Sequence, residues 1–187
     1  IKVKSEAAVI EAAQGADVTS EAARGDIEAQ IAACEEEAVR TALDEHFIVR
    51  ISWVFGHNGG NFVKTMLRLG AEKDEISVVF DQVGSPTYAA DLAKTIVHIL
   101  FESEWIPGVY HFTNEGVCSW FDFAKMIFEL SGIDCKVNAI SSAEYKCRTP
   151  RPFYSVLNKK KIKETFRVEV PYWVDSLKEC LEKLKNN

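Results

Sequence analysis

Three side chains in this sequence have the chemistry to bind a phosphorylated ligand that also carries a flat ring. Trp53 follows an apolar run, Asn61 precedes an amphipathic run, and Arg151 lies between two prolines. The planar guanidinium of Arg151 suits a phosphate, although a surface ion pair is an equal alternative. Asn61 can cap a helix or contact a phosphate, and a tryptophan at such a position is as typical of a core as of a ligand site.

A second group, Gln82, Pro86 and Thr87, lies in one turn and is expected to shape the wall of a crevice, with direct ligand contact as the alternative. Metal chemistry is not indicated. The four histidines lack metal-ligand spacing, and the five cysteines are scattered without Cys-x-x-Cys, which argues against a zinc site and a disulfide framework. We therefore expect no metal and a reduced, cytoplasmic protein.

The elements that must position these side chains can be predicted from apolar patterning. Residues 47–52 form an apolar, β-branched run that predicts a buried parallel strand, and its carboxyl end should open into a crevice. Open α/β sheets bind ligands at such edges. From Asn61 to Gly70 the apolar residues share one helical face, so Asn61 stands at a helix start.

Downstream, strands and helices alternate. Strands are predicted at 76–80, 109–112 and 136–140, and helices at about 91–100, 119–130, 159–165 and 171–184. Ser119 should cap the second of these helices and Gly132 should end it. A mobile loop is expected at 148–152. This alternation predicts an α/β domain.

The first 46 residues differ in composition from the rest. They hold twelve alanines and eleven acidic against four basic side chains. We predict a short strand at 1–4, a helix at 7–14, and a helical run from Ser20 to Glu45 that is interrupted at Gly25-Asp26. An apolar stripe on this run should pack on the strand from Phe47. The expected division is an acidic, mainly helical segment at 1–46 and a globular region at 47–187.

Composition limits the partners. The chain has 187 residues and is 47% apolar, which suits one domain with a sizeable core, and no run reaches the length of a membrane span. No secretory signal is visible. Beyond residue 46 the 18 basic and 17 acidic side chains nearly balance and leave no basic patch. We expect neither nucleic acid nor a membrane as a partner.

Four sequence blocks carry a family resemblance. They are Ser52-Trp53-Val54-Phe55-Gly56, Asn61-Phe62 with Lys64-Thr65-Met66-Leu67, Asp81-Gln82-x-Gly84-x-Pro86-Thr87 with Asp91-Leu92-Ala93, and Arg151-Pro152-x-x-Ser155-x-Leu157. In order and spacing they resemble the C-terminal half of dTDP-4-dehydrorhamnose reductases, which belong to the extended short-chain dehydrogenase/reductase superfamily. The resemblance covers about three quarters of the chain, from Phe47 to Leu184, and omits residues 1–46.

The resemblance implies a partial Rossmann-like sheet with a C-terminal substrate-binding region, preceded here by an atypical Ala/Glu-rich helical segment. It also implies hydride transfer from NADPH or NADH to dTDP-4-dehydrorhamnose, which gives dTDP-rhamnose. Trp53 then matches a tryptophan that lies against the sugar nucleotide, and Arg151 matches an arginine near the diphosphate. Asn61, Phe62, Gln82, Pro86 and Thr87 complete the expected substrate site.

Two parts of that enzyme are missing from the sequence. No glycine-rich turn follows residues 1–4, and none of the five tyrosines has a lysine four residues later. Aligning the run that ends at Glu45 with the family's catalytic helix places Glu28 and Ala32 where tyrosine and lysine belong, so a proton donor and its supporting cation are lost. Gly56-x-x-Gly59-Gly60 is interpreted as a flexible loop.

We therefore expect no catalytic or cofactor-binding residues in this chain. One interpretation is a fragment or variant of the reductase that is inactive alone, with weak binding of a dTDP-sugar nucleotide. A homo-oligomer or a separate cofactor-domain chain would then complete it. The alternative is a non-catalytic sugar-nucleotide-binding or regulatory module, and a purely structural helical fusion is a third possibility.

Overall fold

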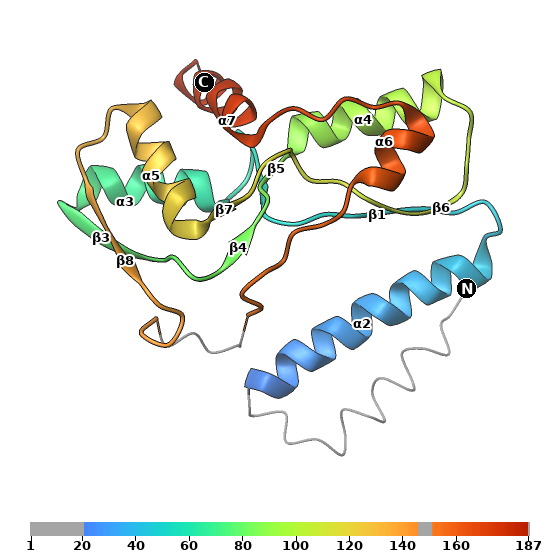
Figure 1. The fold of residues 1–187 in the computed structure, drawn as a ribbon, viewed down its shortest axis with the longest axis horizontal. Coiled ribbons are helices and arrows are strands. Elements are labelled where there is room, and N and C mark those ends of the chain that lie inside the picture. The colour runs from blue at the N-terminus through green and yellow to red at the C-terminus, as the bar shows by residue number, and fades with distance from the viewer. Residues whose placement is uncertain (1–20, 146–150, 187) are drawn as a thin grey trace.

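The computed structural model describes residues 21–145 and 151–186 (Figure 1). Its elements, in chain order, are α2 (Glu21–Ala42), β1 (Phe47–Arg50), β2 (Val54–Phe55), α3 (Phe62–Glu72), β3 (Glu75–Val79), β4 (Val83–Gly84), β5 (Thr87–Tyr88), α4 (Ala89–Glu102), β6 (Gly108–His111), β7 (Cys118–Ser119), α5 (Trp120–Ser131), β8 (Lys136–Ile140), α6 (Lys160–Phe166) and α7 (Trp173–Lys185).

The strands form four separate pairs. β1 pairs with β6, β2 with β5 and β3 with β8, all parallel, whereas β4 and β7 are antiparallel. In Figure 1, α3 and α5 lie together on one side of β3 and β8, and α4 and α6 lie on one side of β1 and β6. The short pairs β2/β5 and β4/β7 lie between these two groups. The predicted α/β fold is confirmed.

The first group is held together by a core of aliphatic and aromatic side chains. α5 contributes Phe123, Ala124, Ile127 and Phe128, and α3 contributes Val63 and Met66. The reciprocal hydrogen bonds of Ser119 and Asp122 fix the start of α5, and Gly132 ends it with a φ of 67°. The predicted cap and stop of this helix are thus confirmed.

A second, smaller core lies under α4 and α6. It consists of Ile99, Tyr110, Phe112, Ile162, Phe166 and Val168. β1 supplies Phe47 and Val49 at its margin, and both are only partly buried. The predicted strand at 47–52 is parallel, as expected, but it is shorter and less buried than predicted: β1 spans Phe47–Arg50, and β6 is its one partner among the described strands.

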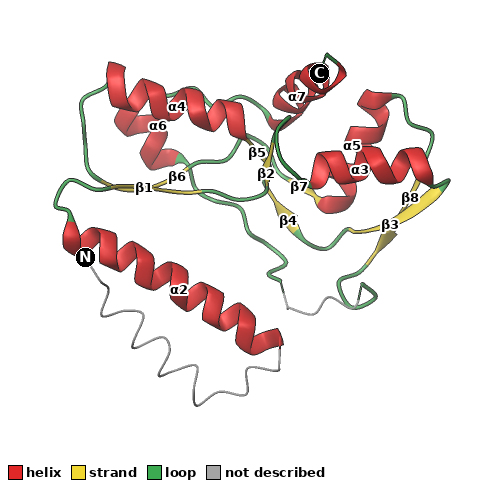
Figure 2. Ribbon diagram, turned by 180° about the vertical axis from the view of Figure 1, so that it is seen from behind, coloured by secondary structure: helices red, strands yellow, loops and turns green. Residues whose placement is uncertain are grey.

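The helix before β1 departs from its prediction in three ways. α2 continues through Gly25-Asp26 without interruption and ends at Ala42, not Glu45. Its apolar stripe does not pack fully on β1, since Val39 is 38% exposed and Ala42 is also exposed. In both views α2 lies on the opposite side of β1 from α4 and α6 (Figure 1, Figure 2).

What joins α2 to β1 is an ion pair. Arg50 donates from Nε and Nη2 to the two carboxylate oxygens of Glu36 at 2.8 and 2.6 Å. The hydrogen bonds from Arg50 hold the pKa of Glu36 below its usual value. Because Arg50 is exposed, solvent screens this pair and it contributes little stability.

Some predictions lie outside the described residues: the strand at 1–4, the helix at 7–14 and Ser20. The expected loop at 148–152 lies mostly outside as well. Within residues 21–145 and 151–186, no helix is long and apolar enough to cross a membrane. The same ranges hold no group of three or more His, Cys, Asp or Glu side chains placed to bind a metal ion.

Among the glycines from Gly56 to Gly132, Gly116 should be the least replaceable. Its φ is 91°, and a Cβ built there would lie 2.3 Å from Cε2 of Tyr172. We expect Gly116→Ala to lower the free energy of unfolding by about 2–4 kcal/mol, because backbone strain and overpacking add. Urea unfolding measures this. Gly59→Ala is the control, since Gly59 has a φ of 66° but nothing within 4 Å of its Cβ position; equal losses in the two variants would contradict the account.

Candidate functional site

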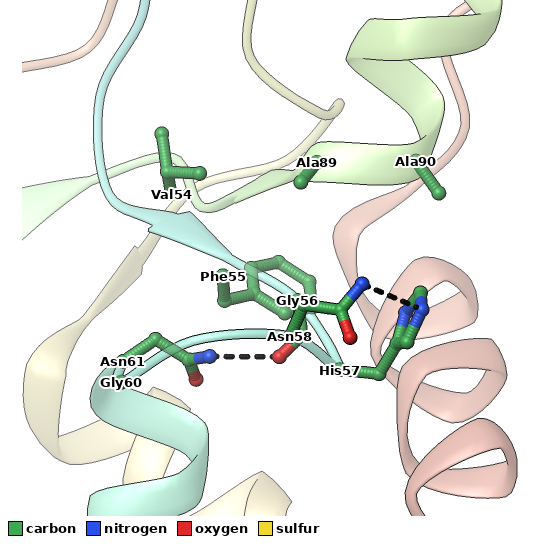
Figure 3. A pocket seen from close by; sticks show the side chains of 9 residues that line it. All are labelled: Val54, Phe55, Gly56, His57, Asn58, Gly60, Asn61, Ala89 and Ala90. Atoms are coloured by element: carbon green, nitrogen blue, oxygen red, sulfur yellow. Dashed lines mark hydrogen bonds between the residues drawn. The ribbon is translucent and has the colours of Figure 1, made fainter.

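A first cavity lies where the chain passes from β2 into α3. It has a volume of about 430 Å³ and is lined by the loop from Gly56 to Asn61, by β2 and by the start of α4. Figure 3 shows Asn61 beside this loop, with its amide directed at the carbonyl of Gly56. The starts of α3 and α4 therefore border the same cavity.

Asn61 is a helix cap. Its Oδ1 accepts a hydrogen bond from the Lys64 amide at 3.3 Å, and its Nδ2 donates to the Gly56 carbonyl at 2.7 Å. Of the two alternatives for Asn61, capping is thus observed, whereas a phosphate contact stays a prediction. The two bonds also fix the loop against α3, so that the loop is less free than the sequence suggested.

A second and larger cavity, of about 820 Å³, lies beside α3 and β3. Gln82, Trp120, Phe62 and Arg151 all line it. β4 brings Gln82, Trp120 and Arg151 together. Gln82 precedes β4, and Trp120 follows β7, the antiparallel partner of β4. On the other edge of β4, Val83 donates to the carbonyl of Phe153 at 2.8 Å, which places the Arg151 segment alongside.

Trp53 lies behind this cavity, not in its lining. Its ring stacks on Trp120 with centroids 3.7 Å apart and planes at 15°, and Phe62 lies 4.7 Å from Trp120. A Cβ built at Gly84 would approach Cε2 of Trp53 to 2.7 Å, so the Trp53 ring packs in space that only a glycine at position 84 leaves open. Sequence reasoning missed Trp120, although a tryptophan directly after a helix cap is a visible signal.

Trp53 has an unusual backbone conformation with a φ of 50°, a left-handed value that is rare for bulky residues. The turn at residues 85–87 holds it there. Thr87 donates from its backbone N to the Trp53 carbonyl at 3.1 Å and from Oγ1 to the Ser52 carbonyl at 2.6 Å. Such strain persists only where the surroundings enforce it, and it is concentrated at functional sites.

Pro86 and Thr87 are buried, and the Pro86 carbonyl accepts a hydrogen bond from the Asn114 amide at 3.0 Å. Thr87 therefore supports the Trp53 segment, and Pro86 joins the same turn to Asn114. Ligand contact by either stays a prediction. Arg151, in contrast, is exposed at the edge of the larger cavity, where its guanidinium is accessible to an anion.

The described cysteines offer no nucleophile near these cavities. Cys34, Cys118, Cys135 and Cys180 are free thiols. Burial raises the pKa of Cys118 to about 12 and that of Cys180 to about 11, so both stay protonated at neutral pH. The cavities are suited to binding through aromatic, amide and guanidinium groups.

A dinucleotide cofactor does not fit the described residues. Its pyrophosphate needs a turn of the type Gly-x-Gly-x-x-Gly between a strand and a helix. The loop between β2 and α3 has the different order Gly56-x-x-Gly59-Gly60. The φ of 66° at Gly59 is by itself a reason for a glycine at this position.

Comparisons with known proteins agree with one another. The family model described as "RmlD substrate binding domain" matches residues 29–186. The spore coat polysaccharide biosynthesis protein SpsK of Bacillus subtilis is 43% identical over 147 residues, which are 79% of this chain and 50% of that protein. The dTDP-4-dehydrorhamnose reductase of Aggregatibacter actinomycetemcomitans is 40% identical over 154 residues, which are 76% of this chain and 52% of that enzyme.

A solved structure is similar over the same region. The dTDP-4-dehydrorhamnose reductase of Bacillus anthracis, in complex with NADP, has a TM-score of 0.75 and 40% identity, and the match covers 83% of this chain and 54% of that one. The chain thus spans about half the length of the relatives it matches. The α/β fold is shared with a Rossmann-like reductase. By sequence and by fold, this chain belongs to the RmlD substrate-binding domain family.

Proposed function

We propose that this chain is the sugar-nucleotide-binding part of a dTDP-4-dehydrorhamnose reductase. Its ligand would be dTDP-4-dehydrorhamnose, whose C4 ketone is reduced by a hydride from NADPH or NADH. The part of this chain in that reaction would be to bind and orient the nucleotide diphosphate. The dinucleotide and the proton donor would be held by a cofactor domain, in a longer form of this protein or on another chain.

The observation that carries this proposal is the larger cavity. It places the ring of Trp120, the amide of Gln82 and the guanidinium of Arg151 around one space of about 820 Å³. These groups match a flat base, its polar edge and a phosphate. Family membership narrows the ligand to a sugar nucleotide, because two of the three relatives named above are dTDP-4-dehydrorhamnose reductases.

The edge of β1 offers a place for the cofactor domain. His46 and Arg50 accept hydrogen bonds from Gly108 and Phe112 of the β6 segment. Alternate residues of a strand direct their backbone groups to opposite edges. The backbone N–H and C=O groups of Phe47 and Val49 therefore point away from β6. Among the described strands none pairs with that second edge. A parallel strand of the cofactor domain would satisfy it, as a second copy of this chain would in a homo-oligomer.

Arg151→Ala is expected to weaken the binding of dTDP about tenfold, because a hydrogen-bonded phosphate contact contributes roughly 1.5–3 kcal/mol. For the unaltered chain we expect a Kd on the order of 1 mM, since one wall of the site comes from another domain. Backbone amide chemical shifts during a dTDP titration give both constants.

Arg68→Ala is the matched control, since Arg68 is exposed on α3 and pairs with Glu72 at 2.9 Å, and it does not line the cavity. It should leave the affinity unchanged. Equal Kd values for the unaltered chain and Arg151→Ala would remove Arg151 from the site. The absence of any saturable shift at millimolar dTDP would overturn the proposed function.

A non-catalytic binding module is the second candidate. It is favoured by the lack of any Tyr-x-x-x-Lys pair in the sequence and of a fitting dinucleotide turn in the described residues. Both candidates require the same nucleotide site. They differ in whether the site supports reduction once a cofactor domain is supplied. NADPH consumption by a hybrid with such a domain distinguishes them.

A further inference from the structure

The Gln82 side chain is a buried amide at the larger cavity. It is 5% exposed and lines the cavity directly before β4. The register of β4 and β7 pairs Val83 with Ser119, so Gln82 and Trp120 extend from the same end of this antiparallel pair. A planar group stacked on Trp120 would therefore present its edge toward Gln82.

Hydrogen bonds of Ser142 determine that Nε2 of Gln82, and not Oε1, faces Ser142. Ser142 donates from Oγ to Asp81 at 2.7 Å and from its backbone N at 2.9 and 3.0 Å. These bonds hold the pKa of Asp81 below its usual value, so Asp81 is a charged, accept-only group at neutral pH. The single hydroxyl proton of Ser142 is thus used. Its oxygen can only accept from Gln82, whose Nε2 lies 3.0 Å away.

The remaining atoms of the Gln82 amide are therefore free to bind a ligand. Oε1 of Gln82 is directed away from Ser142, and no hydrogen bond from the described residues reaches it. One proton of Nε2 is also unused, because an amide nitrogen carries two. Gln82 therefore offers a carbonyl acceptor beside an N–H donor. Oε1 is not among the buried side-chain atoms that lack a partner, so it is accessible to solvent and to a ligand that donates to it.

We propose that Gln82 recognises the imide edge of a pyrimidine-dione base, thymine or uracil, and that Asp81 and Ser142 orient it for this role. The inference rests on the proposed function, since it requires that the cavity bind a nucleotide. The N3–H of such a base donates to Oε1, and the adjacent carbonyl accepts from Nε2. A methyl group at N3 removes this donor.

Titration of the full chain with dTDP and N3-methyl-dTDP tests this assignment. We expect dTDP to bind at least about tenfold more tightly than the N3-methyl compound, because a site built around a hydrogen bond rejects analogues that lack it. The side-chain amide resonances of Gln82 should shift with dTDP and not with the N3-methyl compound. Equal affinities for the two nucleotides would overturn the base recognition and leave the proposed function standing.

Two variants test the orienting pair. In Asp81→Asn and Ser142→Ala the amide of Gln82 is free to turn, so the preference for dTDP over N3-methyl-dTDP should fall below about threefold. Ser141→Ala is the matched control, because Ser141 donates to Glu144 at 2.7 Å in the same turn and does not line the cavity. An unchanged preference in both test variants would contradict an orienting role. If the unaltered chain binds none of the nucleotides, the proposed function itself fails.

Discussion

Replacing Asn114 by alanine is expected to lower the free energy of unfolding by about 3–5 kcal/mol. Asn114 is fully buried, and its amide joins three segments. Nδ2 donates to Asp91 of α4 and to Ser176 of α7, each at 2.8 Å, and Oδ1 accepts from the Tyr88 amide at 2.7 Å. Without Asn114, the buried carboxylate of Asp91 loses a donor, and two neighbouring polar groups lose a partner.

Urea unfolding followed by circular dichroism measures the loss. Asn58→Ala is the control, since Asn58 is exposed and its side chain forms a hydrogen bond only with His57 among the described residues, at 3.2 Å. It should change stability by no more than about 0.5 kcal/mol. If both variants unfold at the same urea concentration as the unaltered chain, the network around Asp91 is not what joins α4 to α7.

Local features of the fold were predictable from the sequence. Asn61, Ser119 and Gly132 lie at helix ends where their side chains or backbone conformations satisfy neighbouring groups. β8 was predicted with the same bounds as observed. These features depend on residues close together in the sequence. The failures at α2 have a matching cause, because Gly25 is tolerated inside a helix and the segment has little amphipathic character to direct its packing.

The candidate site depends on contacts that are distant in the sequence. The motifs indicated Gln82 and Arg151, but nothing local showed that β4 would bring Trp120 beside them. The orientation of Gln82 depends on Ser142, 60 residues away. Trp53 was selected for its position after a strand, and the structure places it behind Trp120. The division of the chain at residue 46 stays a prediction.

The chain alone is expected to oxidise NADPH with dTDP-4-dehydrorhamnose no faster than buffer. The sequence has no Tyr-x-x-x-Lys pair, and general acid catalysis by such a group is worth about 10²–10⁴ in rate. A hybrid should recover the reaction. It would join the cofactor-binding half of the Bacillus anthracis reductase to residues 47–187 of this chain, which replace the matching half of that enzyme.

The most direct test of the proposed function is the rate at which this hybrid consumes NADPH in the presence of dTDP-4-dehydrorhamnose. We predict turnover within about 100-fold of the parent reductase, because a misplacement of about 1 Å across the new interface costs on that order. Arg151→Ala in the hybrid should raise KM for the sugar nucleotide. A hybrid that melts cooperatively and binds NADP, yet consumes no NADPH above background, would contradict the assignment of this chain as the substrate-binding part of a reductase.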